Sequence, residues 1–314
     1  MGFGGGARNI KKGVGHFLIS SLEKYRFIRD NMRNYSVERM CRLLGVSRSG
    51  YYKWRCQGLS KRRIYRQKLL SKIREIYGDS RGLYGSPRIH AELIRIGYKC
   101  SRKLVSDIMR KAGIRSRIRK SYKRTTIRNY KDKYSENLLK KNDVIHGSDS
   151  VWVSDITYLK VSGGWKYLTT IMDLYSRKIV GYAFSTGMSA RETVLRAFRF
   201  AVKHCGRIPS IFHSDRGSQY SSLEFRNELK RLKISQSMTS DGHCYDNAYA
   251  ESFFKTVKVE LVQFLKGMTW EMMKNAIFEY IECFYNRKRL HSGIGYLTPD
   301  EKYQSFCKLN EMIA

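Results

Sequence analysis

Three carboxylates that lie far apart along the chain have residue types and spacing suited to catalysis. Asp155 stands inside a β-rich run, Asp215 follows a short apolar run, and Glu251 falls in the first turns of a helix-forming segment. Thirty-five residues separate Asp215 from Glu251. Three acids that converge repel one another unless a cation neutralises them. We therefore predict that Asp155, Asp215 and Glu251 form a catalytic set that binds divalent metal.

Magnesium is the predicted cofactor of this set. It prefers oxygen ligands and usually takes one or two protein carboxylates, which leaves positions for water and a substrate phosphate. Two such ions about 4 Å apart can hold both the attacking and the leaving oxygen of an in-line phosphoryl displacement. The sequence thus predicts two Mg²⁺ ions, with Mn²⁺ as a substitute, and no side-chain nucleophile. Gly217, close behind Asp215, is expected to let a phosphate backbone approach.

A lysine on the glutamate's helix completes the predicted site. Lys258 follows Glu251 by seven residues, about two helical turns, and so lies on the same helix face. We predict that it contacts the phosphate next to the reacting one. Lys255 offers Glu251 a different partner at i+4, but an exposed pair of this kind contributes only tenths of a kcal/mol.

Structural roles compete with the catalytic interpretation. Each of the three carboxylates alone also fits a strand edge, a turn or a helix surface, and only their joint placement favours catalysis. Three further acids are candidates, Asp173 before a hairpin turn and Asp241 and Asp246 in a glycine-containing loop. We interpret Asp173 and Asp241 as turn residues, and Asp246 or Asn247 as a helix cap.

The elements that must position these acids begin near residue 150. The runs "SVWVSDITYLK", "WKYLTTIMDLYS" and "KIVGYAFS" predict an antiparallel three-stranded meander. A helix, a short strand, a second helix and another strand follow, and this alternation predicts parallel additions to the sheet. The order matches an α/β ribonuclease H-like domain with a mixed five-stranded sheet and helices. It places Asp215 just past the C-terminal end of the fourth strand, where open α/β sheets keep their sites.

The front of the chain is predicted to be all-α. Residues 36–56 show helical periodicity, a stop at Gly45 and a second helix capped by Ser47. This order fits a helix-turn-helix, and an ordinary helical hairpin fits it equally well. As a helix-turn-helix, its second helix would offer four side chains to DNA: Arg48, Tyr51, Tyr52 and Lys53.

A similar helical pair is predicted over residues 86–113. Pro87 suits a first helical turn, Gly97 separates the two helices, and Ser101 can cap the second. We predict Arg102 and Lys103, at the start of that second helix, as DNA contacts. Nine Lys and Arg then stand between residues 115 and 133 with one acid, which fits either a solvated charge run or a linker along a phosphate backbone. From this run we predict three further DNA contacts: Arg117, Arg119 and Lys120.

Charge favours a nucleic-acid partner. The 314-residue chain carries a formal charge of +34, and residues 1–150 hold 38 Lys and Arg against 11 Asp and Glu, a net +27. Such a surplus releases many counterions on a polyanion, so DNA or RNA ranks above an anionic membrane surface or a ribosomal role. No run of about 18 apolar residues and no signal peptide is present, so no membrane contact and a cytoplasmic location are expected. The seven cysteines lack CxxC spacing, which favours reduced thiols, and His213, His243 and Cys244 are interpreted as structural.

The motifs around the acids resemble a known family. "WVSDITY", "FHSDRGSQY" and "CYDNAYAESFFKTVKVE" are similar to the catalytic motifs of DDE transposases related to retroviral integrases, in particular the insertion sequence three family. The likeness also covers "YGSPRIHAELIRIGYKCSRKLVSDIMRKAGI" and "YNRKRLHSGIGYLTPDEKY", and so nearly all of residues 36–303. It implies that Asp155, Asp215 and Glu251 are the metal-binding triad and that Lys258 contacts the element end.

The resemblance also implies an activity and partners. Such enzymes cleave one strand at an element end to expose a 3′-hydroxyl, and then use a 3′-hydroxyl in strand transfer. The implied partners are double-stranded DNA, as terminal inverted repeats and as target, and further copies of the chain in a dimer or larger assembly, in a prokaryotic cytosol near the nucleoid. Active family enzymes usually fuse an upstream frame to the catalytic frame. This chain resembles the downstream, catalytic part, so an upstream-frame protein is a further candidate partner.

Two rival functions remain at this point. A tyrosine recombinase is disfavoured because "YNRKRLHSG" lacks an HxxR element and follows the carboxylate helix. A catalytically inactive DNA-binding regulator of transposition fits the charge equally well. The predicted division of the chain is a tail and connecting helix (1–35), a helix-turn-helix-type region (36–114), a basic linker (115–145), a ribonuclease H-like integrase core (146–265) and a C-terminal helical extension (266–314).

Overall fold

The computed structural model describes residues 20–56, 60–118, 135–140, 145–239, 248–265 and 267–313, with side chains at all of these except 140 and 310–313. The described residues form two compact units, divided between Ser71 and Lys72. The boundary between them falls within one helix, α5 (Lys61–Asp79), and so inside the helical region predicted for 36–114. Several predictions concern residues outside the described part of the chain: Arg119, Lys120, Asp241, His243, Cys244, Asp246 and Asn247.

The first unit is a small helical cluster, with α2 (Ser21–Asn31), α3 (Val37–Leu44) and α4 (Arg48–Cys56). Gly45 ends α3 in the left-handed conformation at φ 64°, and Ser47 Oγ accepts a hydrogen bond from the Gly50 amide, so both predicted punctuation signals are confirmed. The expectation that Tyr51 is offered to DNA is wrong. Its side chain is fully buried in the core of this unit, because it lies on the face of α4 that packs against Tyr25.

A second helical pair opens the other unit, with α6 (Ser86–Arg95) and α7 (Arg102–Lys111) packed against each other. Pro87 lies in the first turn of α6, and Ser101 caps α7 by accepting a hydrogen bond from the Leu104 amide at 3.2 Å. These features confirm the helix boundaries read from the sequence. They also place Arg102 and Lys103 in the first turn of α7.

One mixed sheet organises the rest of this unit, in the order β3-β2-β1-β4-β5. The first three strands form the predicted antiparallel meander, and β4 and β5 add in parallel. The predicted mixed five-stranded sheet is therefore confirmed. The strands are β1 (Val151–Val161), β2 (Gly164–Asp173), β3 (Ile179–Ser185), β4 (Ile211–Ser214) and β5 (Ser235–Met238).

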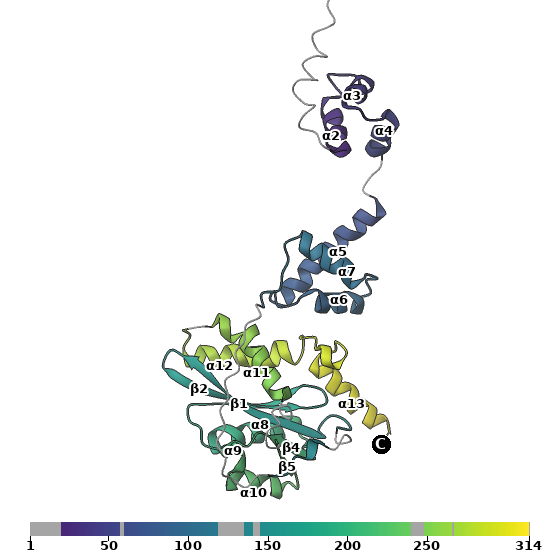
Figure 1. The fold of residues 1–314 in the computed structure, drawn as a ribbon. Helices are drawn as coiled ribbons and strands as arrows, with labels where there is room; N and C mark the ends of the chain where they lie inside the picture. The colour runs from purple at the N-terminus through teal and green to yellow at the C-terminus, as the bar shows by residue number, and fades with distance from the viewer. Residues whose placement is uncertain are drawn as a thin grey trace, which may run out of the picture. The chain divides into compact units, whose positions relative to one another are not determined.

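Helices cover both faces of the sheet (Figure 1). On one face, α8 (Arg196–Cys205) and α10 (Leu223–Arg231) bury a core that includes Trp152, Phe198 and Phe212. Helix α11 (Ala248–Glu260) packs on β1 and β2. The sheet is thus a rigid platform between helices. Shorter elements join them: a π-helical turn before α8 (Arg191–Leu195), α9 (Ser218–Ser221), and 3₁₀ turns at Leu138–Lys140, Val262–Phe264 and Ser292–Ile294.

The C-terminal helices close the unit. Helix α12 (Trp270–Glu279) continues into a π-helical segment (Tyr280–Tyr285), and α13 (Pro299–Ile313) ends the described chain. The predicted capping box of α13 is present, because Thr298 Oγ1 accepts from the Glu301 amide and Glu301 accepts from the Thr298 amide. None of the described helices is at once long and apolar enough to cross a membrane. The six cysteines in the described residues are free thiols.

Candidate active site

The strand register brings two of the predicted acids together. Strands β1 and β4 run parallel, and their ladder ends with Ser154 opposite Ser214. Asp155 and Asp215 are the next residues of the two strands, and neighbouring strands lie about 4.8 Å apart. Because side chains alternate between faces along a strand, both carboxylates leave the same face of the sheet. The prediction that Asp215 follows the C-terminal end of the fourth strand is confirmed.

The turn after Asp215 is closed by its own carboxylate. Asp215 Oδ1 accepts a hydrogen bond from the Gly217 amide at 3.0 Å. A Cβ on Gly217 would stand 3.1 Å from that same oxygen, which is tighter than ordinary contact. Gly217 therefore leaves room for the carboxylate itself, a role that adds to the predicted approach of a phosphate. Arg216 donates to the Thr239 carbonyl at 2.7 Å and ties the turn to the end of β5.

Helix α11 carries the third acid and the predicted lysine. Glu251 lies in its first turns and is exposed, whereas Lys258 is half-buried near its C-terminal end. Buried Phe253, Phe254 and Val257 form the face by which the helix packs. The helix thereby presents Glu251 and Lys258 to the strand that bears Asp155, and the electrostatics of Asp155 reflect both.

Burial and like charge act together on Asp155. Burial, the charge of Asp215 and, to a smaller extent, that of Glu251 together raise the pKa of its carboxyl to about 8. Lys258 and a 2.8 Å hydrogen bond from the Ile156 amide act in the opposite direction. Burial also lowers the pKa of Lys258, while Asp155 raises it. A strongly perturbed carboxyl among other acids is typical of a functional site.

The donor set fits magnesium better than a softer metal. The three acids offer only carboxylate oxygens, and Asp155 and Asp215 supply the one or two protein ligands that Mg²⁺ usually takes. Among the described residues, no three His, Cys, Asp or Glu side chains lie close enough together to hold a metal ion. The arrangement therefore provides a pair of adjacent carboxylates with a third acid on the neighbouring helix.

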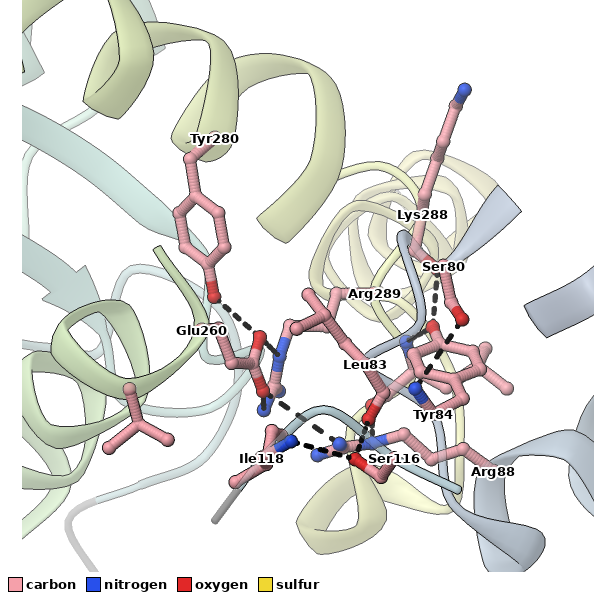
Figure 2. Close-up of polar contacts among 12 residues, drawn as sticks. Ser80, Leu83, Tyr84, Arg88, Ser116, Ile118, Glu260, Tyr280, Lys288 and Arg289 are labelled. Atoms are coloured by element: carbon pink, nitrogen blue, oxygen red, sulfur yellow. Dashed lines mark hydrogen bonds and ion pairs between the residues drawn. The ribbon is translucent and has the colours of Figure 1, made fainter. Parts of the chain in front are cut away.

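The far end of α11 is fixed by a buried ion pair, drawn in Figure 2. Both oxygens of Glu260 accept hydrogen bonds from Arg289, at 2.8 and 2.7 Å, and Tyr280 Oη donates to Glu260 at 2.7 Å. Arg88 of α6 stands 3.8 Å from the same carboxylate. Burial alone would raise the pKa of Glu260, but Arg289, Tyr280 and Arg88 outweigh it and lower the pKa. Nothing in the local sequence pattern marks Glu260 or Arg289 as buried, so this network is not predictable from the sequence.

A tyrosine links the same network to the helical pair (Figure 2). Tyr84 Oη donates to the Lys288 carbonyl at 3.0 Å and accepts from the Leu290 amide at 2.8 Å. Arg88 Nε donates to the Leu290 carbonyl at 3.0 Å. The start of α6 is therefore hydrogen-bonded to the segment that supplies Arg289 to helix α11.

Three aromatic side chains near Lys258 were not among the predicted site residues. A cavity of about 460 Å³ is lined by Tyr158, Trp165, Tyr167 and Lys258. Tyr158 and Trp165 are 52% and 58% exposed, which is high for large rings. A sequence signal existed, because the rings recur at every second position on facing strands of the predicted hairpin.

The competing residues have structural environments. Asp173 is fully buried and accepts hydrogen bonds from the Asp149 amide at 2.9 Å and from the amide and hydroxyl of Ser176. Burial raises its pKa to about 6. It therefore organises the β2–β3 turn, as predicted. His213 is also buried, with Nδ1 2.8 Å from Ser237 Oγ, in agreement with its structural interpretation.

The predicted DNA contacts in the described chain are surface residues. Arg48 lies 3.2 Å from Glu38 in an exposed ion pair, and Lys53 is exposed on α4. Arg102 and Lys103 are exposed at the N-terminus of α7. Arg117 is exposed and stacks over the Phe264 ring at 4.5 Å. Their positions permit contact with a polyanion.

Comparison with protein families gives three matches. An integrase core domain family matches residues 146–244, a second integrase core domain family matches residues 251–305, and an HTH-like domain family matches residues 65–122. The predicted fold class, an α/β integrase-type core preceded by a helix-turn-helix-type region, is confirmed by these matches and the sheet. The catalytic core domain of HTLV-2 integrase, solved in complex with magnesium, is 18% identical with a TM-score of 0.42, over 50% of this chain and 98% of that chain.

Curated relatives extend over most of the chain. It is 37% identical over 282 residues to transposase InsF for insertion sequence IS3A of Escherichia coli (strain K12), which covers 88% of this chain and 97% of that protein. An uncharacterized 31 kDa protein of insertion element IS600 from Shigella sonnei is 35% identical over 269 residues, 84% of this chain and 98% of that protein. The resemblance read from the sequence motifs is thus confirmed, and the chain belongs to the IS3 family of insertion-sequence transposases.

Proposed function

We propose that this transposase cuts one DNA strand at each end of its insertion sequence and joins that end to target DNA by in-line phosphoryl transfer. The observation that carries the proposal is the parallel register of β1 and β4, which sets Asp155 and Asp215 side by side. The pKa of Asp155 adds support. Burial and the charge of Asp215 raise it to about 8, so the ionised form of this carboxyl is unfavourable unless a cation balances its charge.

Asp155, Asp215 and Glu251 would hold divalent metal, Mg²⁺ or Mn²⁺. Two such ions supply charge stabilisation for the attacking and the leaving oxygen of a displaced phosphodiester. The protein itself carries Asp155 and Asp215 at neighbouring strand positions of the sheet, and Glu251 would join them from α11 when metal binds. Lys258 would bind the phosphate beside the reacting one, since its ammonium is half-buried next to Asp155.

Double-stranded DNA is the proposed substrate, both as the terminal repeats of the element and as the target. Arg48 and Lys53 on α4, and Arg102 and Lys103 on α7, would bind phosphates of the terminal repeats, and so would the basic residues from Arg117 onward. Two ends must be held at once, so we propose a dimer or larger assembly of this chain on DNA. An upstream-frame protein is a further proposed partner. The site of action would be the prokaryotic cytosol.

Substitution of one strand carboxylate tests the chemistry. Asp215→Asn keeps the shape of the turn and removes a charge that metal binding needs. We expect intact DNA binding and at least a 100-fold loss of Mg²⁺-dependent nicking and joining, measured on plasmids that carry the element ends. Glu224→Gln is the matched control, since that acid is exposed and pairs with Arg191 on another helix. Persistent joining by Asp215→Asn would refute the metal assignment.

A further inference from the structure

We propose that Tyr158, Trp165 and Tyr167, together with Lys258, bind one unpaired nucleotide of the DNA end, with its base stacked on the rings and its phosphate on the lysine. This inference rests on the proposed function and names a substrate contact outside the carboxylate site. We call the three rings the hairpin aromatics, since they lie on the hairpin of β1 and β2.

The hairpin aromatics form one exposed group. Tyr158 and Tyr167 face each other in the ladder, with ring centroids 5.3 Å apart, and Trp165 stands 6.4 Å from Tyr158 at 89°. Edge contacts of this kind fix the rings and leave ring faces uncovered. Tyr158 and Trp165 are 52% and 58% exposed, and the group lines a cavity of about 460 Å³. That volume lies within the usual range for small-ligand sites, roughly 300–1,000 Å³.

The position of the cavity connects it to the carboxylates. Asp155 and Tyr158 are three positions apart on β1, so their side chains leave opposite faces of the strand. The ladder to β4 ends at Ser154, and beyond it no strand in the described residues covers that edge of β1. Lys258 lines the cavity and also acts electrostatically on Asp155. A DNA strand that passes this open edge of β1 would place one nucleotide at the carboxylates and the adjacent nucleotide in the cavity.

Charge favours a nucleotide over an apolar occupant. Lys160 lies opposite Trp165 in the ladder, and Lys166 is its sequence neighbour. The chain contains no acid between Asp155 and Asp173, so the part of the hairpin that carries the rings is cationic. Three rings also expose far less than the roughly 1,200–2,000 Å² that a stable protein interface buries. Aromatic rings beside lysines are the usual binding surface for single-stranded nucleic acid, and an unpaired nucleotide can insert its base between rings, whereas the bases inside a duplex are stacked on both faces.

Fluorescent DNA can test the stacking. The full chain is titrated, without divalent metal and at about 0.2 M salt, with a blunt duplex and with the same duplex carrying one unpaired 2-aminopurine nucleotide at its end. We expect tighter binding of the second duplex and quenching of its fluorescence. Trp165→Ala should weaken that binding roughly 5- to 100-fold and abolish the quenching, with little change for the blunt duplex. Trp165→Phe should restore most of both signals.

Controls separate this proposal from its rivals. Phe278→Ala removes a ring that is 52% exposed on α12 and should change neither signal. Equal affinity of wild-type protein for both duplexes would overturn the proposal. So would a Trp165→Ala protein that loses only self-association in sedimentation, since the rings would then bind a second copy. Mg²⁺-dependent nicking by the same wild-type preparation tests the proposed function separately, because the binding measurement contains no metal.

Discussion

The two ends of helix α11 treat their acids in opposite ways. At the N-terminal end the charge of Glu251 acts on Asp155, and burial, the charge of Asp215 and, to a smaller extent, that of Glu251 raise the pKa of Asp155 to about 8. At the C-terminal end Glu260 is also buried, yet Arg289 and Arg88 lower its pKa. Both ends belong to one rigid helix. Burial alone therefore does not decide the direction of an acid's pKa shift in this fold; the sign of the surrounding charge does.

The largest effect on stability should follow from breaking the ion pair between Glu260 and Arg289, at the C-terminal end of α11. Arg289→Met leaves Glu260 as a buried charge and should lower the free energy of unfolding by about 3–5 kcal/mol. The double variant Glu260→Gln/Arg289→Met removes both charges and should recover part of that loss. Urea denaturation of the full chain measures both. Arg287→Met is the control, since that side chain is 69% exposed. Equal losses in the single and double variants would contradict the ion-pair account.

Neutralising Asp155, the β1 carboxyl on which Glu251 of α11 acts, should instead stabilise the fold. The pKa of Asp155 is about 8 in the folded chain against 3.8 for an ordinary aspartate, so folding takes up a proton between these values. Stability therefore falls as pH rises from about 4 to 8. Asp155→Asn removes this dependence and should raise the free energy of unfolding at pH 8 by roughly 1–3 kcal/mol in metal-free buffer. A lower melting temperature for Asp155→Asn would contradict this.

His291, close to the Glu260–Arg289 ion pair, should make stability depend on pH in the opposite direction. Burial, with the nearby charge of Arg289, lowers the pKa of His291 from 6.5 to about 4. The unfolded chain then binds a proton that the folded chain refuses, so stability is lost as pH falls from about 6.5 to 4. We expect about 1–2 kcal/mol of this loss to disappear in His291→Asn, whose side-chain oxygen can still accept from the Gly293 amide. Melting curves across this pH range provide the measurement.

The smallest effect is expected at an exposed ion pair in the first unit. Arg48 and Glu38 lie 3.2 Å apart, with side chains 59% and 57% exposed. Glu38→Gln should change the free energy of unfolding by less than about 0.5 kcal/mol, because water screens such pairs. The same substitution should strengthen DNA binding slightly if Arg48 contacts phosphate. A large loss of stability would place this pair in the same class as Glu260 and Arg289.

Local patterns were sufficient to predict the elements and the family. Alternating apolar residues predicted β1 to β3, and Gly45, Ser101 and Thr298 gave helix boundaries that the structure confirms. Predictions failed where tertiary packing decides the outcome. Tyr51 read as a surface residue because its helix is polar, yet a core formed with α2 and α3 buries it. The assignment of Asp155, Asp215 and Glu251 to catalysis stays a prediction.

Long-range partners could not be read from the sequence at all. Glu260 and Arg289 are 29 positions apart, and both look like ordinary surface charges within their segments. Only the fold brings them together. The cavity beside Lys258 could not be predicted for a different reason. Aromatic residues on a hairpin usually pack against other elements, and only the tertiary fold decides whether a helix covers them.

The ion pair between Glu260 and Arg289 has a practical consequence for any attempt to isolate the integrase-type core as a fragment. A polypeptide trimmed to residues 146–265 would keep the glutamate and discard the arginine, the tyrosine hydroxyl of Tyr280 and Arg88 together. Such a fragment should aggregate or melt early even though every strand is retained. The smallest autonomous piece is expected to include the sequence from Tyr84 through Tyr303.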